Sequence, residues 1–453
     1  MDTIAAIATP IGAGGIAIVR ISGEKAFEIG EKIFSPFEKS SLREKKGYTA
    51  CLGMIHRQRE EIDKGIALVF HAPKSYTGED VIELQCHGGV VIARLVLEAA
   101  LDAGAVMAQP GEFSKRAFMN GKMSFEQAES LMDFIQATSL ESAKMARCAM
   151  KGAIYQKSKE IADEITALDA LFRVTMDYPD EDLENFDRQE ILKKILSFQE
   201  SLSKLLEDYQ KAQWIKNGVQ TAIVGAPNVG KSTIMNLLTR QKSSIVADRA
   251  GTTRDVVKED MLLDGFHVKL CDTAGIHQTG DEIEQFGIER SMEMLENSDL
   301  ILFVINCAQS LSNEEISLMQ KMKDKAAIAV LHKTDLEKKV SIKQVEPFFK
   351  RIIFTSQEDE QSIANLKREM IDFFSLNTLN LSAPMLVNER QKRAALCALN
   401  NINACLQAFE QGQSLDVVAF LLEDALDELL SLSGENVQQA VVDEIFSHYC
   451  VGK

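Results

Sequence analysis

The chain has 453 residues, of which 45% are hydrophobic and 26% are charged. This is the composition of a globular protein, and the length suggests two to four domains rather than one. The net charge of −17 excludes nucleic-acid binding over the whole surface, because phosphate affinity depends on Lys and Arg. Any contact with RNA would need a local basic patch or a partner.

The N-terminal residues, the apolar runs and the cysteine spacing together indicate where in the cell the protein is located. The first residues lack a basic region, and no apolar run approaches the roughly 18 residues that a membrane span requires. The eight cysteines include no Cys-x-x-Cys pair, so we interpret them as reduced thiols rather than a metal or disulfide framework. We therefore expect a cytoplasmic protein that does not enter membranes.

Residues 1–118 are predicted to form a mixed α/β domain, because short apolar runs such as 16–19 and 66–70 are bounded by Gly and Pro turns. Residues 119–216 change to a helical period. One apolar stripe in this segment consists of Ile191, Ile195, Phe198, Leu202, Leu205 and Tyr209. We interpret this stripe as core packing with no chemical role.

Residues 217–380 are predicted to form a doubly wound parallel sheet, because apolar runs alternate with helical stretches. The runs span residues 219–224, 268–271, 300–305, 327–331 and 351–354. Residues 381–453 return to helices, with one face formed by Val418, Leu422, Ala425 and Leu429. This order predicts an α/β domain inserted into a helical domain, and two independent helical domains are the alternative. The predicted fold class is multidomain α/β plus α.

Residues 225–232, Gly-Ala-Pro-Asn-Val-Gly-Lys-Ser, form a complete P-loop between an apolar run and a helical pattern. Its glycines allow successive backbone N–H groups to surround phosphates at a helix N-terminus. Lys231 supplies a charge to the β and γ phosphates, and the Ser232 hydroxyl can ligate Mg²⁺. The motif in this context predicts a nucleoside triphosphate site.

Three further segments follow in the order that GTPases use. Residues 250–255 form a polar switch segment in which Thr253 could complete the Mg²⁺ shell. Residues 272–275, Asp-Thr-Ala-Gly, supply a carboxylate for the metal and a backbone amide for the γ phosphate. Residues 332–335 include Asp335, whose carboxylate can accept both N–H donors of guanine. Four such segments together predict GTP binding.

Three positions depart from the usual GTPase pattern. His332 replaces an Asn that braces the loop and reaches guanine, although a ring N–H could substitute as donor. Ser356-Gln357 replaces Ser-Ala, where only a backbone amide is needed. Ile276 replaces the Gln that orients water in Ras-like enzymes. Either hydrolysis is weak, or other groups act, and the candidates are Glu284 and a monovalent cation.

Motifs throughout the chain resemble the MnmE family, GTPases that modify the wobble uridine of tRNA. The motifs are residues 2–5 (Asp-Thr-Ile-Ala), 14–23, 76–80 (Tyr-Thr-Gly-Glu-Asp), 87–89 (His-Gly-Gly), 110–118, 120–122 (Asn-Gly-Lys) and 450–453 (Cys-Val-Gly-Lys). Because these motifs are numerous and dispersed, the resemblance covers essentially the whole chain.

The resemblance implies a K⁺ ion beside the phosphates, held by Asn228 and the carbonyls of Ala247, Arg249 and Thr252. It also implies that Glu284 orients the attacking water, while His277 replaces an Arg common in the family. With the motifs above, it extends the candidate GTP site to Asn228, Val229, Gly230, Lys231, Ser232, Thr233, Ala247, Asp248, Arg249, Ala250, Gly251, Thr252, Thr253, Asp272, Thr273, Ala274, Gly275, Lys333, Asp335, Ser356 and Gln357.

The resemblance further implies that the N-terminal domain forms a homodimer and binds 5,10-methylene- or 5-formyl-tetrahydrofolate. The matching residues are Arg20, Glu83, Lys122 and Lys453. The implied reaction adds a carboxymethylaminomethyl or aminomethyl group to carbon 5 of the wobble uridine, in a heterotetramer with the flavoprotein MnmG, which uses FAD and NADH. The alternatives are a ribosome-assembly GTPase and a nucleotide switch with weak hydrolysis.

Overall fold

The computed structural model describes residues 1–38, 40–58, 60–177, 187–239, 258–272, 298–323, 325–374, 376, 379–434, 439–447, 449 and 451–452. They form two compact units that interleave along the sequence. The first comprises Met1–Met132, Ala149–Phe186 and Gln407–Lys453, and the second comprises Asp133–Cys148 and Asp187–Leu406. Among the described residues, every helix is too short or too polar to span a bilayer.

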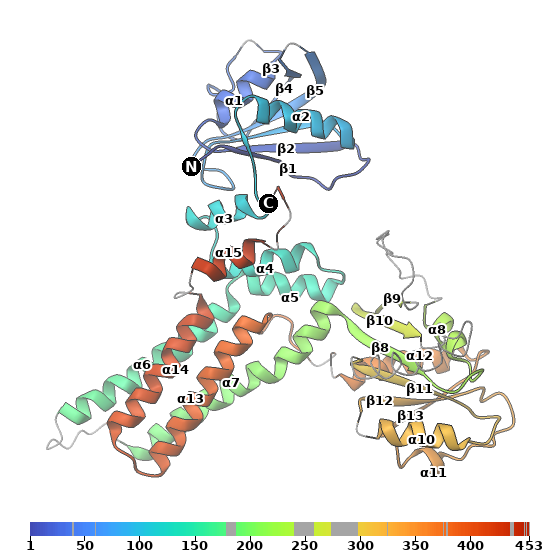
Figure 1. Ribbon diagram of the computed structural model, residues 1–453. Helices are drawn as coiled ribbons and strands as arrows, with labels where there is room; N and C mark the ends of the chain where they lie inside the picture. The colour runs from blue at the N-terminus through green and yellow to red at the C-terminus, as the bar shows by residue number, and fades with distance from the viewer. Residues whose placement is uncertain are drawn as a thin grey trace, which may run out of the picture. The chain divides into compact units, whose positions relative to one another are not determined.

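The first unit contains a seven-stranded sheet in the order β3-β4-β5-β6-β2-β1-β7 (Figure 1). All neighbouring strands pair antiparallel except β1 and β7. The strands are β1 (Ile4–Ile7), β2 (Ile16–Ser22), β3 (Phe34–Pro36), β4 (Thr49–Arg57), β5 (Glu60–Phe70), β6 (Val81–His87) and β7 (Val106–Met107). Two of them contain the predicted runs 16–19 and 66–70, which confirms the α/β character of this segment.

Alternation along the strands gives this sheet two different faces. Helices α1 (Ala26–Ile33) and α2 (Val90–Asp102) cover one face, where their apolar side chains bury Val19, Ile82 and Leu84. On the other face, Phe113 of α3 (Glu112–Met119) packs against Ile4 and Ala6 of β1. Side chains of β2 and β6 that point away from α1 and α2, including Arg20 and Glu83, therefore lie on the same face as α3.

The remaining helices of the first unit are most of α4 (Phe125–Ile135), α6 (Ala153–Asp177), α14 (Leu415–Ser433) and α15 (Gln439–Ser447). Helix α6 runs beside α14 (Figure 1), and Arg173 forms an ion pair with Glu423 between them. The residues predicted to share one helical face, Val418, Leu422, Ala425 and Leu429, all lie on α14 and are buried.

The second unit contains a six-stranded sheet in the order β13-β12-β11-β8-β10-β9. Only the β9–β10 pair is antiparallel, and the other neighbours are parallel. The elements are β8 (Val219–Val224), α8 (Lys231–Thr239), β9 (Lys258–Leu263), β10 (Phe266–Asp272), β11 (Leu300–Asn306), α10 (Asn313–Met322), β12 (Ala327–His332), α11 (Ile342–Val345), β13 (Arg351–Thr355) and α12 (Glu360–Phe373). The five predicted apolar runs coincide with the five parallel strands.

The second unit also contains most of α5 (Leu140–Met150), α7 (Arg188–Asn217) and most of α13 (Glu389–Glu410). The predicted stripe on α7 is buried throughout. Gln199 Nε2 of α7 donates to Asn403 Oδ1 of α13 at 2.7 Å. Helices that precede the second sheet in sequence thus pair with helices that follow it, as an insertion requires. The boundaries at residues 118, 216 and 380 remain predictions.

Candidate functional site

The P-loop joins β8 to α8 in an unusual backbone conformation. The φ angles of Gly225, Asn228 and Gly230 are 153°, 62° and 108°. Residues other than glycine rarely adopt such φ values, although Asn tolerates the left-handed region. A Cβ at Gly225 would also stand 2.3 Å from the carbonyl oxygen of Val304 in β11. The positive φ angles and the close contact with β11 therefore favour glycine at positions 225 and 230 and asparagine or glycine at position 228.

Lys231 lies inside this curl. Its Nζ donates to the carbonyl oxygens of Gly225 at 2.9 Å and Ala226 at 2.8 Å, and the residue is only 8% exposed. Ser232 is exposed in the first turn of α8, Thr233 is half-buried beside it, and Val229 is buried beneath the loop. A lysine charge, a hydroxyl and a helix N-terminus thus converge as phosphate and Mg²⁺ binding requires.

His332 lies under the P-loop at the end of β12. Its side chain is buried, and its Nδ1 lies 3.1 Å from the Thr355 hydroxyl. A Cβ at Gly230 would stand 2.4 Å from Cδ2 of the imidazole, so the ring packs directly against the loop. Burial, followed by the charge of Lys333, lowers the pKa of His332. The imidazole is therefore neutral at pH 7 and braces the loop, one of the two roles that Asn has in other GTPases.

The candidate guanine-recognition residues follow two adjacent parallel strands. Lys333 has a φ of 62°, and its Nζ lies 3.4 Å from the carbonyl oxygen of Asn228 in the P-loop. Asp335 and Gln357 are exposed, whereas the buried Ser356 donates its backbone N–H to Ser362 Oγ at 3.3 Å. Since β12 and β13 are in register, both segments lie at the carboxyl edge of the sheet, where α/β folds bind ligands.

Asp272 completes β10, where its backbone is in register with Ile223 of β8, the strand that leads into the P-loop. The other candidate residues of this site lie outside the described residues. They are Ala247, Asp248, Arg249, Ala250, Gly251, Thr252, Thr253, Thr273, Ala274, Gly275 and Glu284. The described part of the metal sites consists of Ser232 for Mg²⁺ and Asn228 for K⁺.

Two of the four candidate folate residues contact each other. Arg20 and Glu83 are cross-strand neighbours on β2 and β6, and the Arg20 Nε donates to Glu83 Oε1 at 2.7 Å. The guanidinium carbon also lies 5.2 Å from the ring centre of Tyr76 and 5.5 Å from that of Phe113. Lys122 is exposed beyond the end of α3, and Lys453 lies outside the described residues.

A polar network beside this pair was not predicted. The buried Arg116 of α3 donates to Glu79 at 3.1 Å and to Glu112 at 2.7 Å. The Ser22 hydroxyl donates to Glu79 at 2.7 Å, and Asn120 Nδ2 donates to the Thr77 carbonyl at 2.7 Å. All but Ser22, which belongs to motif 14–23, come from motifs 76–80, 110–118 and 120–122, so the density of polar residues in these motifs was the available signal. The network holds α3 against the loop after β5.

Comparisons with known proteins agree with this arrangement. The family described as GTP-binding protein TrmE N-terminus matches residues 3–122, and the MnmE helical domain matches residues 125–450. The tRNA modification GTPase MnmE of Thermoanaerobacter sp. (strain X514) is 36% identical over 100% of this chain and 99% of its own length. The protein of the same name from Lactobacillus johnsonii is 37% identical over 100% and 98%.

Solved structures match over a smaller region. A variant of Era from Aquifex aeolicus, bound to GDP·AlF4⁻, is 25% identical over 40% of this chain and 66% of that chain, with a TM-score of 0.28. The family matches and the full-length identities are decisive, and the chain belongs to the MnmE family of tRNA modification GTPases.

Proposed function

We propose that this GTPase binds GTP and Mg²⁺ at the P-loop, hydrolyses GTP with the help of K⁺, and acts in the modification of the tRNA wobble uridine. The observation that carries the nucleotide site is the position of Lys231, whose ammonium donates to two carbonyl oxygens of a loop with positive φ at Gly225, Asn228 and Gly230. Lys333 supports guanine recognition, because its contact with Asn228 ties the segment that contains Asp335 to the P-loop.

Asn228 is the described residue that would hold K⁺. It has a φ of 62° and is exposed on the P-loop, beside the expected position of the phosphates. The cation would supply positive charge beside the phosphates, which stabilises the charge that develops during hydrolysis. The carbonyls of Ala247, Arg249 and Thr252 are proposed as its other ligands, and Glu284 as the group that orients water.

In the N-terminal domain we propose a tetrahydrofolate site that uses Arg20, Glu83, Lys122 and Lys453. The Arg20–Glu83 pair fits a folate with both basic and acidic groups, because each member could exchange its partner for one on the ligand. The one-carbon unit would become part of the group added to carbon 5 of the wobble uridine. We propose that this occurs in the cytoplasm, in a homodimer joined by the flavoprotein MnmG.

Nucleoside mass spectrometry of tRNA tests this proposal. A bacterial strain that lacks its own family member would be complemented with this chain. We expect the carboxymethylaminomethyl or aminomethyl uridine to return at the wobble position, and ribosome profiles to stay normal with or without the chain. A wobble uridine that remains unmodified, together with a corrected ribosome-assembly defect, would contradict the proposal and favour an assembly GTPase.

A further inference from the structure

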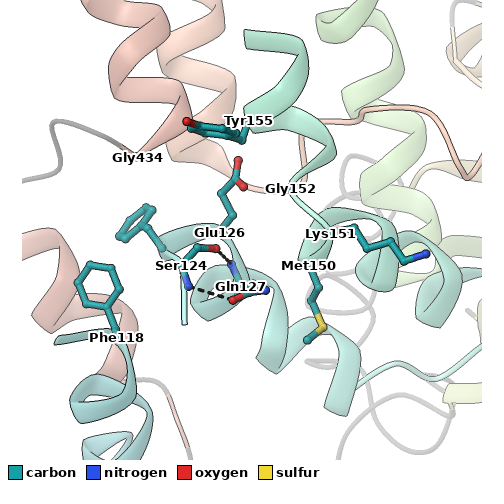
Figure 2. Close-up of a pocket in the computed structure, with 10 residues that line it drawn as sticks. Phe118, Ser124, Glu126, Gln127, Met150, Lys151, Gly152, Tyr155 and Gly434 are labelled. Atoms are coloured by element: carbon teal, nitrogen blue, oxygen red, sulfur yellow. Dashed lines mark hydrogen bonds between the residues drawn. The ribbon is translucent and has the colours of Figure 1, made fainter. Parts of the chain in front are cut away.

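A pocket of about 340 Å³ lies in the first unit, where the start of α4 faces the turn that leads into α6 (Figure 2). Its described lining includes Phe118, Ser124, Glu126, Lys151, Tyr155 and Gly434. Among the described residues that line it, none belongs to the candidate nucleotide or folate sets. Its volume is within the range of pockets that bind small planar ligands.

Glu126 gives this pocket an acceptor. The residue is 6% exposed, and its side chain is directed toward Tyr155 in Figure 2. Gly152 has a φ of 75°, and a Cβ there would stand 3.1 Å from Glu126 Oε2, so the glycine leaves room for the carboxylate. A carboxylate accepts hydrogen bonds and donates none when ionised. A ligand that meets Glu126 must therefore present an N–H or O–H group.

The start of α4 holds Glu126 in place. Ser124 Oγ accepts from the Gln127 backbone N–H at 3.2 Å, and Gln127 Oε1 accepts from the Ser124 backbone N–H at 2.9 Å. This reciprocal cap fixes the first turn of the helix, in which Glu126 lies. A carboxylate in the first turn is also stabilised by the helix dipole.

Aromatic side chains give the pocket flat walls. Tyr155 and Phe118 both line it, and Phe118 contacts Phe125 edge-on with ring centres 6.2 Å apart. An acceptor among aromatic side chains suits a planar heterocycle with a ring N–H, because proteins stack unpaired bases on aromatic rings and bind their Watson–Crick edges. Uracil, with its N3–H, and a pterin both have this chemistry.

We propose that this pocket takes an unstacked uridine of the tRNA substrate, with N3–H donated to Glu126 and the ring against Tyr155. This inference rests on the proposed function, since an enzyme that modifies a base must first remove it from the stack. Lys151 is exposed, and its ammonium extends away from Glu126, where it can contact a phosphate outside the pocket (Figure 2). A uridine is favoured over a pterin because the described candidate folate residues Arg20, Glu83 and Lys122 do not line this pocket.

The test measures equilibrium binding of the full-length chain to two synthetic anticodon stem–loops. One carries uridine at the wobble position, and the other carries 3-methyluridine, which has no N3–H. Glu126→Leu removes the acceptor, whereas Glu126→Gln keeps a carbonyl that can accept from N3–H. Glu129→Leu is the matched control, because Glu129 lies one turn further along α4 and does not line the pocket.

We expect Glu126→Leu to weaken binding of the uridine stem–loop by roughly tenfold or more, the usual effect of losing a hydrogen bond to a charged group. Glu126→Gln should retain most of the affinity for the uridine stem–loop, and Glu129→Leu should leave this affinity nearly unchanged. The 3-methyluridine stem–loop should bind the wild-type chain as weakly as the Leu variant binds uridine. Tyr155→Ala, but not Tyr155→Phe, should weaken binding by roughly fivefold or more, because it removes stacking.

Equal binding of the two stem–loops by the wild-type chain, or no binding of either, would overturn the inference. Loss of tetrahydrofolate binding in Glu126→Leu, with stem–loop binding intact, would overturn it in favour of a pterin. GTP turnover in KCl is measured on the same preparations and depends on the other unit of the chain. A failure of this pocket is thereby distinguished from a failure of the proposed GTPase function.

Discussion

The imidazole of His332 packs so closely against Gly230 that a Cβ at position 230 would stand 2.4 Å from its Cδ2. The contact joins the end of β12, which leads to the candidate guanine site, to the P-loop, which surrounds the phosphates. The Thr355 hydroxyl holds the other side of the ring at 3.1 Å from Nδ1. The buried side chain of His332 therefore contacts the P-loop, which is expected to bind the phosphates, and belongs to the segment that is expected to bind the base.

Gly230→Ala should abolish tight GTP binding. The new Cβ meets the His332 ring, and the φ of 108° is strained for alanine, which together cost about 1–3 kcal/mol of stability. GTP affinity and thermal unfolding measure the two effects. Gly12→Ala is the control, because a Cβ there meets nothing within 4 Å. Unchanged GTP affinity in Gly230→Ala would show that the loop does not have this conformation.

His332 should make stability depend on pH. Because burial lowers its pKa in the folded state below the ordinary value of 6.5, the unfolded chain binds more protons between these two values. The stabilising effect of the neutral ring is complete above pH 6.5 and is lost as pH falls below it. His332→Asn should therefore lose less stability than wild type between pH about 7 and about 5.5.

Urea unfolding at the two pH values measures this difference. The variant should keep part of the pH dependence, because the pKa of His267 is also lowered, mainly by burial, and that residue is unchanged. Identical pH dependence in the wild-type chain and His332→Asn would mean that His332 titrates normally.

The Arg20–Glu83 pair should behave as a coupled unit. Their side chains are 19% and 14% exposed, so removal of either leaves a partly buried charge without its partner. We expect a double-mutant cycle of Arg20→Ala and Glu83→Ala to give a coupling of about 1–2 kcal/mol. Both single variants should also weaken tetrahydrofolate binding. Additive effects on stability would show that the pair is not formed in solution.

Arg116 should matter for stability rather than for chemistry. Arg116→Met removes the partner of Glu79 and Glu112 in a buried network and should cost about 3–5 kcal/mol. Lys115→Met, on the same helix, removes the more exposed pair with Asp443 and should cost at most about 1 kcal/mol. Thermal unfolding compares them. Equal losses in the two variants would contradict the structural role of the network.

The sequence predicts those features that depend on local patterns. Strands β11 and β12 of the second sheet are nearly continuous apolar runs because both of their faces are buried. The edge strand β9, Lys258–Leu263, was not predicted, since charged residues interrupt its apolar pattern. It pairs with β10 in a tight hairpin whose turn is Asp264-Gly265, with both residues at positive φ, so this dipeptide was the available signal.

In the candidate sites, too, the features formed by neighbouring residues were predicted, whereas contacts between distant residues were not. The P-loop was predicted because its residues are contiguous, and Lys231 lies where the motif requires. The packing of His332 on Gly230 and the pairing of Arg20 with Glu83 join residues far apart in the sequence. Periodicity carries no information about such contacts, which depend on strand order and register. The switch residues and Glu284 remain predictions, because they lie outside the described residues.

The rate of GTP hydrolysis in KCl compared with NaCl, measured for the wild-type chain and for Asn228→Ala, tests the central claim most directly. If Asn228 holds a cation beside the phosphates, K⁺ should accelerate hydrolysis by the wild-type chain. The variant should lose this acceleration while largely retaining GTP binding. Equal wild-type rates in the two salts, or loss of GTP binding in Asn228→Ala, would contradict the account.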